Sequence, residues 1–352
     1  MSRLTWHRAF ASAGLAGACL LQAGTGAAEV EVAPDLRAEV VVVGIPRPVQ
    51  LALDGAGHLV VLSQGWRGDA AGEVYHFDLA ALPLDASHAP RVVIPFSDEP
   101  RKAALGSVAL DPRSQDLFMG EENGNRIYRL GAGGRLTVFG VGLNNLLGGS
   151  SLTFDRLGRL VVVDYTSPEE QQRSESPPPA SFEALAGDAY QGPVVIRLDP
   201  HEDVRLPRRF DLITPVLPSG SVRPDRVEPL YRFISLATTP SGAIVLLDSV
   251  GHLFTLNDDR VLRLLVRLPA GHYHRTNMAV GPDGSVFVSS GFQIRQIFRV
   301  SPEGVVEVVA QDLGDPEGIA VDGDGTLYVA ENALHRVIRI RSRVRLPRAS
   351  QR

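Results

Sequence analysis

Cysteine is almost absent from this chain, because the only one among its 352 residues is Cys19. A protein without further thiols cannot build a disulfide framework or a cysteine-ligated zinc site. Three motifs are also missing: a glycine-rich phosphate loop between a strand and a helix, a Gly-x-Ser-x-Gly turn and a His-Glu-x-x-His helix. The sequence therefore gives no sign of nucleotide binding, an α/β-type serine hydrolase or a zinc protease.

Positive charge is scarce as well. The chain has 35 lysines and arginines against 40 aspartates and glutamates, a formal charge of −5. Residues 1–28 contain two arginines and residues 335–352 contain seven, with no acid in either stretch, so residues 29–334 carry a balance of −14. This acidic excess argues against a general nucleic-acid binder, which gains affinity by neutralising phosphates.

The first 28 residues contain a long apolar run. Arg3, His7 and Arg8 precede the apolar residues 9–23, and the small residues 24–28 follow. This order is typical of a secretory signal peptide cleaved after Ala28, and the run is shorter than the roughly 20 residues that span a membrane. We expect an exported protein, periplasmic or secreted, with no transmembrane segment after signal removal. A buried N-terminal helix and a lipid anchor at Cys19 are the alternatives.

Six copies of one unit fill the rest of the chain: a short apolar strand, a turn and a second apolar strand. The turns open at Asp54, Asp111, Asp155, Thr239, Gly281 and Asp322. Their spacings are 57, 44, 84, 42 and 41 residues, which indicates a period of 41–44 with two larger insertions. Each unit continues with two further strand-like runs, and four short strands every ~40–45 residues are typical of a propeller blade.

The last unit has a third strand over 335–340 but no fourth before the arginine-rich end. A matching strand, 38–44, precedes the first unit, and pairing the two would close the ring and hide both open edges. The sequence therefore predicts an all-β, six-bladed β-propeller over residues 29–341, closed by an N-terminal strand that completes the last blade. Residues 342–352 are expected to form a basic C-terminal tail. A two-sheet sandwich explains neither the shared turn nor the period.

The sixth unit carries a family resemblance. It reads Asp315-Pro-Glu-Gly-Ile-Ala-Val-Asp-Gly-Asp-Gly-Thr-Leu-Tyr-Val-Ala-Glu-Asn332. This unit resembles an NHL repeat and is equally similar to the blades of the six-bladed superfamily of gluconolactonase and SMP-30-like proteins. The repeats cover nearly the whole expected mature chain. The resemblance implies the fold, whereas the same scaffold hosts lactonases, phosphotriesterases, lyases, synthases and binding modules.

The lactonase-like members of this superfamily hold a divalent metal, usually calcium, through carboxylates and amides at the start of the innermost strands. Glu317 matches such a position, so the resemblance implies a metal, Ca²⁺ or Zn²⁺, with Glu317 as a ligand. The equivalent residues of the other units, counted from the turn, are Val49, Gly106, Ser150, Ile234 and Thr276. None is a carboxylate, although the amide of Asn277 lies one position away.

A second set of candidate ligands ends the second strands. In a propeller these strands end on the face where the innermost strands begin. The residues expected there, one per unit, are Ser63, Glu121, Asp164, Asp248, Ser290 and Glu331. Four carboxylates around one opening repel one another unless a cation lies between them, which makes Glu121, Asp164, Asp248 and Glu331 candidate metal ligands. Alternatively, each solvates its strand end or binds neighbouring backbone.

The loop before the fifth unit adds candidate catalytic residues. One residue separates His272 from His274, so in an extended chain both rings point the same way. This is a possible spacing for transition-metal ligands. Either histidine could act as a general base near neutral pH. Arg275 could hold a substrate carboxylate or pair with Glu317. The amides of Asn144, Asn145 and Asn277 are candidate substrate-binding groups.

The longest insertion, residues 166–191, joins the second and third strands of unit three on the same face. It is either a lid over the channel or a solvated excursion.

Two functions follow from these features. The first is an exported enzyme that acts on a small molecule at the channel mouth, by metal-assisted hydrolysis of the lactonase kind. The second is a non-catalytic periplasmic propeller that binds an envelope protein or a glycan, which the poor match at the metal positions favours.

Overall fold

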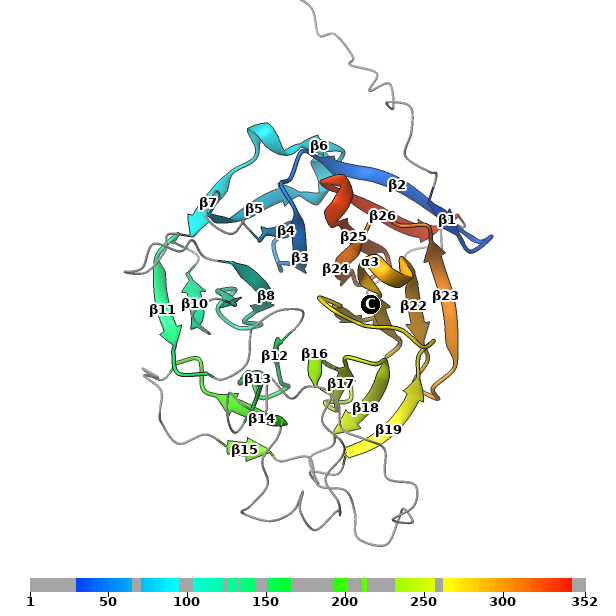
Figure 1. Ribbon diagram of the computed structural model, residues 1–352. Coiled ribbons are helices and arrows are strands. Elements are labelled where there is room, and N and C mark those ends of the chain that lie inside the picture. The colour runs from blue at the N-terminus through cyan, green and yellow to red at the C-terminus, as the bar shows by residue number, and fades with distance from the viewer. Residues whose placement is uncertain are drawn as a thin grey trace, which may run out of the picture.

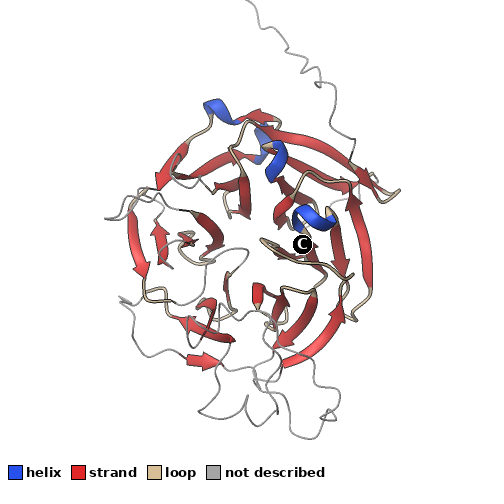
Figure 2. Cartoon of the chain, in the orientation of Figure 1, coloured by secondary structure: helices blue, strands red, loops and turns tan. Residues whose placement is uncertain are grey.

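The computed structural model describes residues 30–64, 71–94, 104–122, 126–131, 133–143, 151–165, 193–201, 211–213, 232–256 and 262–343. Six separate sheets surround one central axis, with strands β3, β8, β12, β16, β20 and β24 nearest to it (Figure 1). Strands dominate and helices are confined to short connections (Figure 2). The predicted all-β, six-bladed propeller is confirmed.

Each blade contains one sheet. Blade 1 consists of β3 (Pro48–Leu53), β4 (His58–Ser63), β5 (Gly72–Asp78) and β7 (Arg91–Ile94). Blade 2 consists of β8 (Leu105–Leu110), β9 (Leu117–Glu121), β10 (Arg126–Leu130) and β11 (Leu136–Gly140). Blade 3 consists of β12 (Leu152–Phe154), β13 (Leu160–Tyr165), β14 (Pro193–Leu198) and β15 (Asp211–Ile213).

The second half of the ring repeats this plan. Blade 4 consists of β16 (Phe233–Thr238), β17 (Ile244–Asp248), β18 (His252–Leu256) and β19 (Leu262–Arg267). Blade 5 consists of β20 (Met278–Val280), β21 (Val286–Ser289), β22 (Ile297–Val300), β23 (Val306–Gln311) and the added β1 (Glu31–Val32). Blade 6 consists of β24 (Pro316–Val321), β25 (Leu327–Glu331), β26 (Arg336–Ser342), β2 (Leu36–Val43) and the added β6 (Leu84–Asp85).

The second strand of each blade is its most buried element. Every residue of β9, β13, β17 and β25 is buried. A strand that packs against a neighbouring blade on both faces has no solvated side, which explains why these strands read as continuous apolar runs rather than as an alternating pattern. Six apolar clusters, one between each pair of neighbouring blades, make up the core.

Aspartate side chains fix the turns between first and second strands. The Oδ1 of Asp54 accepts from the backbone N–H of Ala56 at 2.9 Å and of His58 at 2.7 Å. Asp155 and Asp322 make the same pair of bonds two and four residues ahead. These carboxylates satisfy turn donors that no strand can reach, which is why aspartate recurs at this position.

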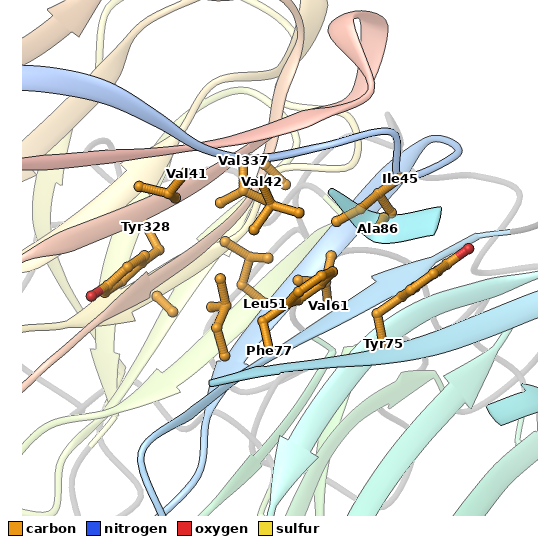
Figure 3. Close-up of a cluster of buried hydrophobic side chains, with 13 residues drawn as sticks. Val41, Val42, Ile45, Leu51, Val61, Tyr75, Phe77, Ala86, Tyr328 and Val337 are labelled. Atoms are coloured by element: carbon orange, nitrogen blue, oxygen red, sulfur yellow. The ribbon is translucent and has the colours of Figure 1, made fainter. Parts of the chain in front are cut away.

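The N-terminal strand closes the ring as the sequence predicts. Strand β2 pairs antiparallel with β26 from Leu36 against Ser342 to Val43 against Arg336. Beneath the seam, Val41, Val42 and Ile45 pack with side chains of blades 1 and 6 (Figure 3). Strand β26 ends at Ser342, just inside the segment assigned to the tail.

Two features of the closure go beyond the sequence analysis. Strand β1 adds to the outer edge of β23, and β6 pairs in parallel with the end of β2, so the N-terminal segment ties blade 5 to blade 6.

The helices in the described part of the chain are short connections, and none of them could span a lipid bilayer.

Candidate functional site

We call the face where the innermost strands begin the upper face. One residue position on these strands forms a polar ring around the axis, made of Gln50, Ser107, Ser151, Ser235, Asn277 and Gly318. Its five side chains are at most 2 % exposed. Gln50 Nε2 donates to Asn277 Oδ1 at 2.7 Å, and Asn277 Nδ2 donates to the carbonyl of Val49 at 3.1 Å. Blade 1 is thus joined to blade 5 across blade 6.

Glycine at position 318 makes this contact possible. A Cβ built there would lie 2.7 Å from Gln50 Cα, a distance that real Cβ atoms essentially never show. The missing side chain lets β3 and β24 approach closely and leaves room for the hydrogen bond between the Gln50 and Asn277 side chains. The ring divides the channel: a space of about 550 Å³ opens below it, lined by all six innermost strands.

Glu317 lies directly above the ring and is only 4 % exposed. Its backbone carbonyl accepts a hydrogen bond from Ser289 Oγ at 2.5 Å. No described residue donates a hydrogen bond to its carboxyl group, which faces a narrow pocket shared with Gln64, Glu122 and Arg275. A buried carboxyl without a donor is costly to ionise, so this group is a candidate for chemistry rather than for structure.

Two guanidinium groups and two further carboxylates surround Glu317. Arg275 Nη1 donates to Gln64 Oε1 at 2.5 Å, and Arg275 Nη2 lies 3.6 Å from Glu122 Oε2. Arg47 and Asp315 also interact electrostatically with Glu317. We call Arg47, Glu122, Arg275, Asp315 and Glu317 the mouth cluster; it holds three acids and two bases.

Burial and like charge raise the pKa of Glu317 well above its ordinary value. Burial is the larger cause and Asp315 the next, while Arg275 opposes them. Burial also raises the pKa of Asp315, which Arg275 and Arg47 partly offset. The pKa of Arg47 is lowered by its burial and by the nearby Arg275. Burial thus opposes the ionisation of both carboxyl groups, Glu317 and Asp315.

Two of the predicted metal ligands have structural partners in their own blades. Glu331 Oε1 accepts from the backbone N–H of Gly314 at 2.7 Å, and its Oε2 from Arg336 Nε at 2.5 Å. Asp248 accepts from the backbone N–H of His252 at 2.8 Å and contacts the His252 ring at 2.9 Å. Such bonds are those expected if these residues bind neighbouring backbone and side chains at the strand ends rather than a metal ion.

The other two candidates are also buried. Glu121 is 2 % exposed and Asp164 is 5 % exposed, each at the upper end of its second strand. The backbone N–H of Ala104 donates to Glu121 Oε1 at 3.5 Å, and the backbone N–H of Gly314 makes the equivalent hydrogen bond to Glu331 in blade 6. Within the described ranges, no three His, Asp or Glu side chains gather closely enough to hold one metal ion.

His272 and His274 lie side by side, as the alternation predicts. Both are exposed, and their rings are parallel within 8° with centroids 5.7 Å apart. Tyr273 between them is fully buried and donates through its hydroxyl to the carbonyl of Pro269 at 2.7 Å. The loop is thus anchored by its central residue. The catalytic role of the two histidines stays a prediction.

Three sequence expectations fall outside the described residues: Asn144 and Asn145, the insertion 166–191 and the leader 1–28. Asn277 is described, and its amide belongs to the polar ring.

Sequence reasoning missed Arg47, Gln64, Glu122 and Asp315. A signal for each was present. Arg47 and Asp315 both stand directly before the proline that opens an innermost strand, and Gln64 and Glu122 each follow the last residue of a second strand. In blades 1 and 2 the sequence analysis named the last residue of the second strand, Ser63 and Glu121, whereas the next residue is the one that contacts the mouth cluster.

The described donors fit the implied metal poorly. The Asn277 amide is already held in the polar ring, since its Oδ1 accepts from Gln50 and its Nδ2 donates to Val49. The guanidinium groups of Arg47 and Arg275 also act on Glu317, where a divalent cation would meet two like charges.

No protein-family model matches the sequence, and no curated protein matches it. Solved structures with the same architecture do. The pyranose dehydrogenase PQQ domain of Coprinopsis cinerea has a TM-score of 0.58 at 11 % identity, over 89 % of this chain and 97 % of that one. A protein assigned as an oxidoreductase (glucose dehydrogenase) from Thermus thermophilus has a TM-score of 0.56 at 21 % identity, over 87 % and 99 %.

A protein assigned as a gluconolactonase is also similar, with a TM-score of 0.52 at 15 % identity, over 90 % of this chain and 95 % of that one. At these identities the likeness shows the six-bladed fold alone. It agrees with the expected gluconolactonase-like architecture and leaves the NHL assignment a prediction.

Proposed function

We propose that this protein is an enzyme that acts on a small molecule at the upper mouth of the channel, with Glu317 as its acid–base group. The observation that carries the proposal is the buried carboxyl of Glu317, which has no hydrogen-bond donor among the described residues and lines a narrow pocket with Arg275. Perturbed acids of this kind concentrate at catalytic sites. The names of the similar propellers, a gluconolactonase and two sugar dehydrogenases, agree with a small-molecule substrate.

Hydrolysis of a lactone or ester is the reaction that the cluster supports best. Burial raises the pKa of Glu317 well above its ordinary value, so its carboxyl keeps a proton to higher pH than an exposed glutamate and can donate it to the leaving oxygen as the C–O bond breaks. The half-buried Asp315 accepts the proton of the attacking water, and Arg275 stabilises the negative charge that develops on the carbonyl oxygen. Proton exchange with solvent then restores both acids.

Glu317→Gln tests this role, because the amide keeps the shape of the side chain but cannot transfer a proton. We expect the wild-type protein to hydrolyse at least one of δ-gluconolactone, γ-butyrolactone and p-nitrophenyl acetate. The variant should lose about 100-fold or more in kcat/KM, the usual size of an acid–base contribution. Glu303→Gln is the matched control, since Glu303 is exposed on a turn of the opposite face. Equal rates for wild type and Glu317→Gln contradict the proposal.

Metal assistance through Glu317 is a separate proposal that rests on the resemblance of the sixth unit. Elemental analysis of the purified protein, with rates before and after chelation, tests it. Turnover that survives removal of all divalent metal would contradict it while leaving the acid–base proposal intact. If the protein is inert toward every substrate, binding of an envelope protein or glycan becomes the better assignment.

We also propose export, on the charge and apolar pattern of residues 1–28. The recovered protein is then expected to begin at Glu29 by N-terminal sequencing. Protein that keeps Met1 in the cytosol would contradict this.

A further inference from the structure

The lower half of the channel is a space that the proposed function does not use. It measures about 550 Å³, and Gln50 of the polar ring bounds it from above. Ligand pockets usually enclose about 300–1,000 Å³ and have apolar walls with a few polar groups. The hydrogen bond between Gln50 and Asn277 separates this space from the mouth cluster, so a molecule that binds in it enters from the lower face.

The walls follow a regular pattern along the innermost strands, which surround the axis (Figure 1). The position after the polar ring is buried and apolar in every blade. Its residues are Leu51, Val108, Leu152, Leu236, Met278 and Ile319. The next position carries alanine in five blades and Thr153 in blade 3, so small side chains leave the space open. The third position carries Thr238 in blade 4 and apolar residues in the others, all partly exposed, which shows that the channel opens to solvent at this end.

Backbone groups supply part of the polarity of these walls. Each innermost strand is the last strand of its sheet, so its inner edge has no strand partner. In an antiparallel ladder, alternate residues direct their N–H and C=O groups away from the partner strand. The inner edges therefore present uncharged donors and acceptors to the channel, and these groups need partners from water or from a ligand.

Two hydroxyl groups belong to the same walls. Thr153 of β12 and Thr238 of β16 line the space from the neighbouring blades 3 and 4. Thr238 Oγ1 is buried, and no described residue forms a hydrogen bond with it. A buried hydroxyl without a partner is costly, so a ligand that supplies a donor or an acceptor to Thr238 gains binding free energy.

The described residues that line the space include only two charged side chains, Asp155 and Arg156, both at its lower rim. Each is already engaged. Asp155 Oδ2 accepts from Arg159 Nε at 2.8 Å, and Arg156 Nη1 donates to the carbonyl of Ser241 at 3.0 Å. An ion in the channel would lose its hydration without gaining a counter-charge, and a plain hydrocarbon would leave the backbone edges without partners.

We propose that the lower half of the channel is a second binding site, for an uncharged small molecule that combines an apolar body with a hydroxyl or a similar hydrogen-bonding group. The apolar body packs against the buried side chains below the polar ring, and the polar group bonds to Thr238 or to an inner strand edge. This inference goes beyond the proposed function, since it uses no residue of the mouth cluster.

Ligand-observed NMR with the full chain at neutral pH tests the site. The probes are 2-naphthalenemethanol, 2-naphthoate and 2-naphthylmethylammonium, which share one apolar body and differ in charge. We expect the alcohol to bind at least about 10-fold more tightly than either ion, because the channel offers neither ion a free counter-charge. Equal binding of the three probes, or no binding of the alcohol, would refute the proposal.

Variants locate the bound alcohol. Ala279→Phe should weaken its binding by about 10-fold or more, because Ala279 lines the space and a phenyl group takes up part of it. Ala81→Phe, the same change at an exposed position between β5 and β7, is the matched control and should bind as wild type does. Thr238→Val should weaken binding by about 3- to 10-fold, the size of one hydrogen bond. Glu317→Gln should leave binding unchanged, and a loss in that variant would assign the alcohol to the mouth cluster and overturn the lower site.

Should Ala279→Phe fail to fold, Ala279→Cys in a Cys19→Ser background is a smaller change. At about ten times its Kd, 2-naphthalenemethanol should slow the reaction of this thiol with N-ethylmaleimide by about 10-fold, the ratio of total to ligand-free protein. A labelling rate that the alcohol does not change would contradict a site in the lower channel.

Discussion

Two buried glutamates of blade 6 show how the surroundings of a single side chain decide its role. Glu331 is fully buried, and its carboxylate is bound by Arg336 and by the backbone of Gly314. Glu317 is almost as buried, but no described residue donates to it. Removal of Arg336 would leave the Glu331 carboxylate without its charged partner, whereas burial without a donor raises the pKa of Glu317.

Glu317 should give the unfolding free energy a measurable pH dependence. Its raised pKa means that the folded protein holds a proton that the unfolded chain has lost. Stability therefore falls as pH rises from the unfolded value of 4.5 through the folded pKa, by about 1.4 kcal/mol for each pH unit in that window. Glu317→Gln removes the ionisable group, so urea denaturation should show a flatter dependence of the unfolding free energy on pH for the variant above pH 5. Identical profiles would mean that Glu317 ionises freely in the folded state.

The contact between β3 and β24 is the feature of the innermost strands that most constrains the site. It depends on Gly318, where an added Cβ would meet backbone atoms of Gln50 at 2.7–3.0 Å. The same approach allows the bond from Gln50 to Asn277 that closes the channel below Glu317.

Gly318→Ala should therefore destabilise the protein by about 1–3 kcal/mol, the usual cost of overpacking, because backbone cannot move aside as a flexible side chain can. Gly323→Ala, in the turn of the same blade, meets nothing within 4 Å and should stay within about 0.5 kcal/mol of wild type. Urea midpoints measured at one pH compare the two. Equal urea midpoints for the two variants would mean that the close approach of β3 and β24 does not contribute to the unfolding free energy.

Closure of the ring is a property of the whole molecule. Strand β2 pairs with β26 along its length, and Arg339 Nε donates to Glu39 Oε1 at 2.7 Å, across a sequence separation of 300. This one seam joins segments from opposite ends of the chain and covers both edges that would otherwise stay open.

A disulfide across the seam tests the closure, and the near absence of cysteine makes the experiment clean. Glu39 and Arg339 are paired residues, so Glu39→Cys with Arg339→Cys in a Cys19→Ser background should form a crosslink within one molecule. The oxidised form should gain about 2–4 kcal/mol of unfolding free energy over the reduced form of the same variant. Crosslinked dimers on a non-reducing gel would instead indicate that β2 pairs with a second copy.

Repetition made the fold predictable from the sequence. The period of the turns, the aspartates that open them and the unequal strand count at the two ends determined a six-bladed ring and its closing strand, because each depends on local chemistry repeated along the chain. The face of the channel mouth followed from strand direction alone. Glu317 and Arg275 were identified because they lie in conspicuous motifs.

Only the tertiary structure decided what surrounds them. Arg47, Gln64, Glu122 and Asp315 come from blades 1, 2 and 6, and a sequence does not show which side chains of different blades meet at the axis. The expected ligands Glu331 and Asp248 look equivalent to Glu317 in sequence, but donors within their own blades engage them. Burial, charge balance and hydrogen bonding depend on distances across the ring, which no local pattern encodes.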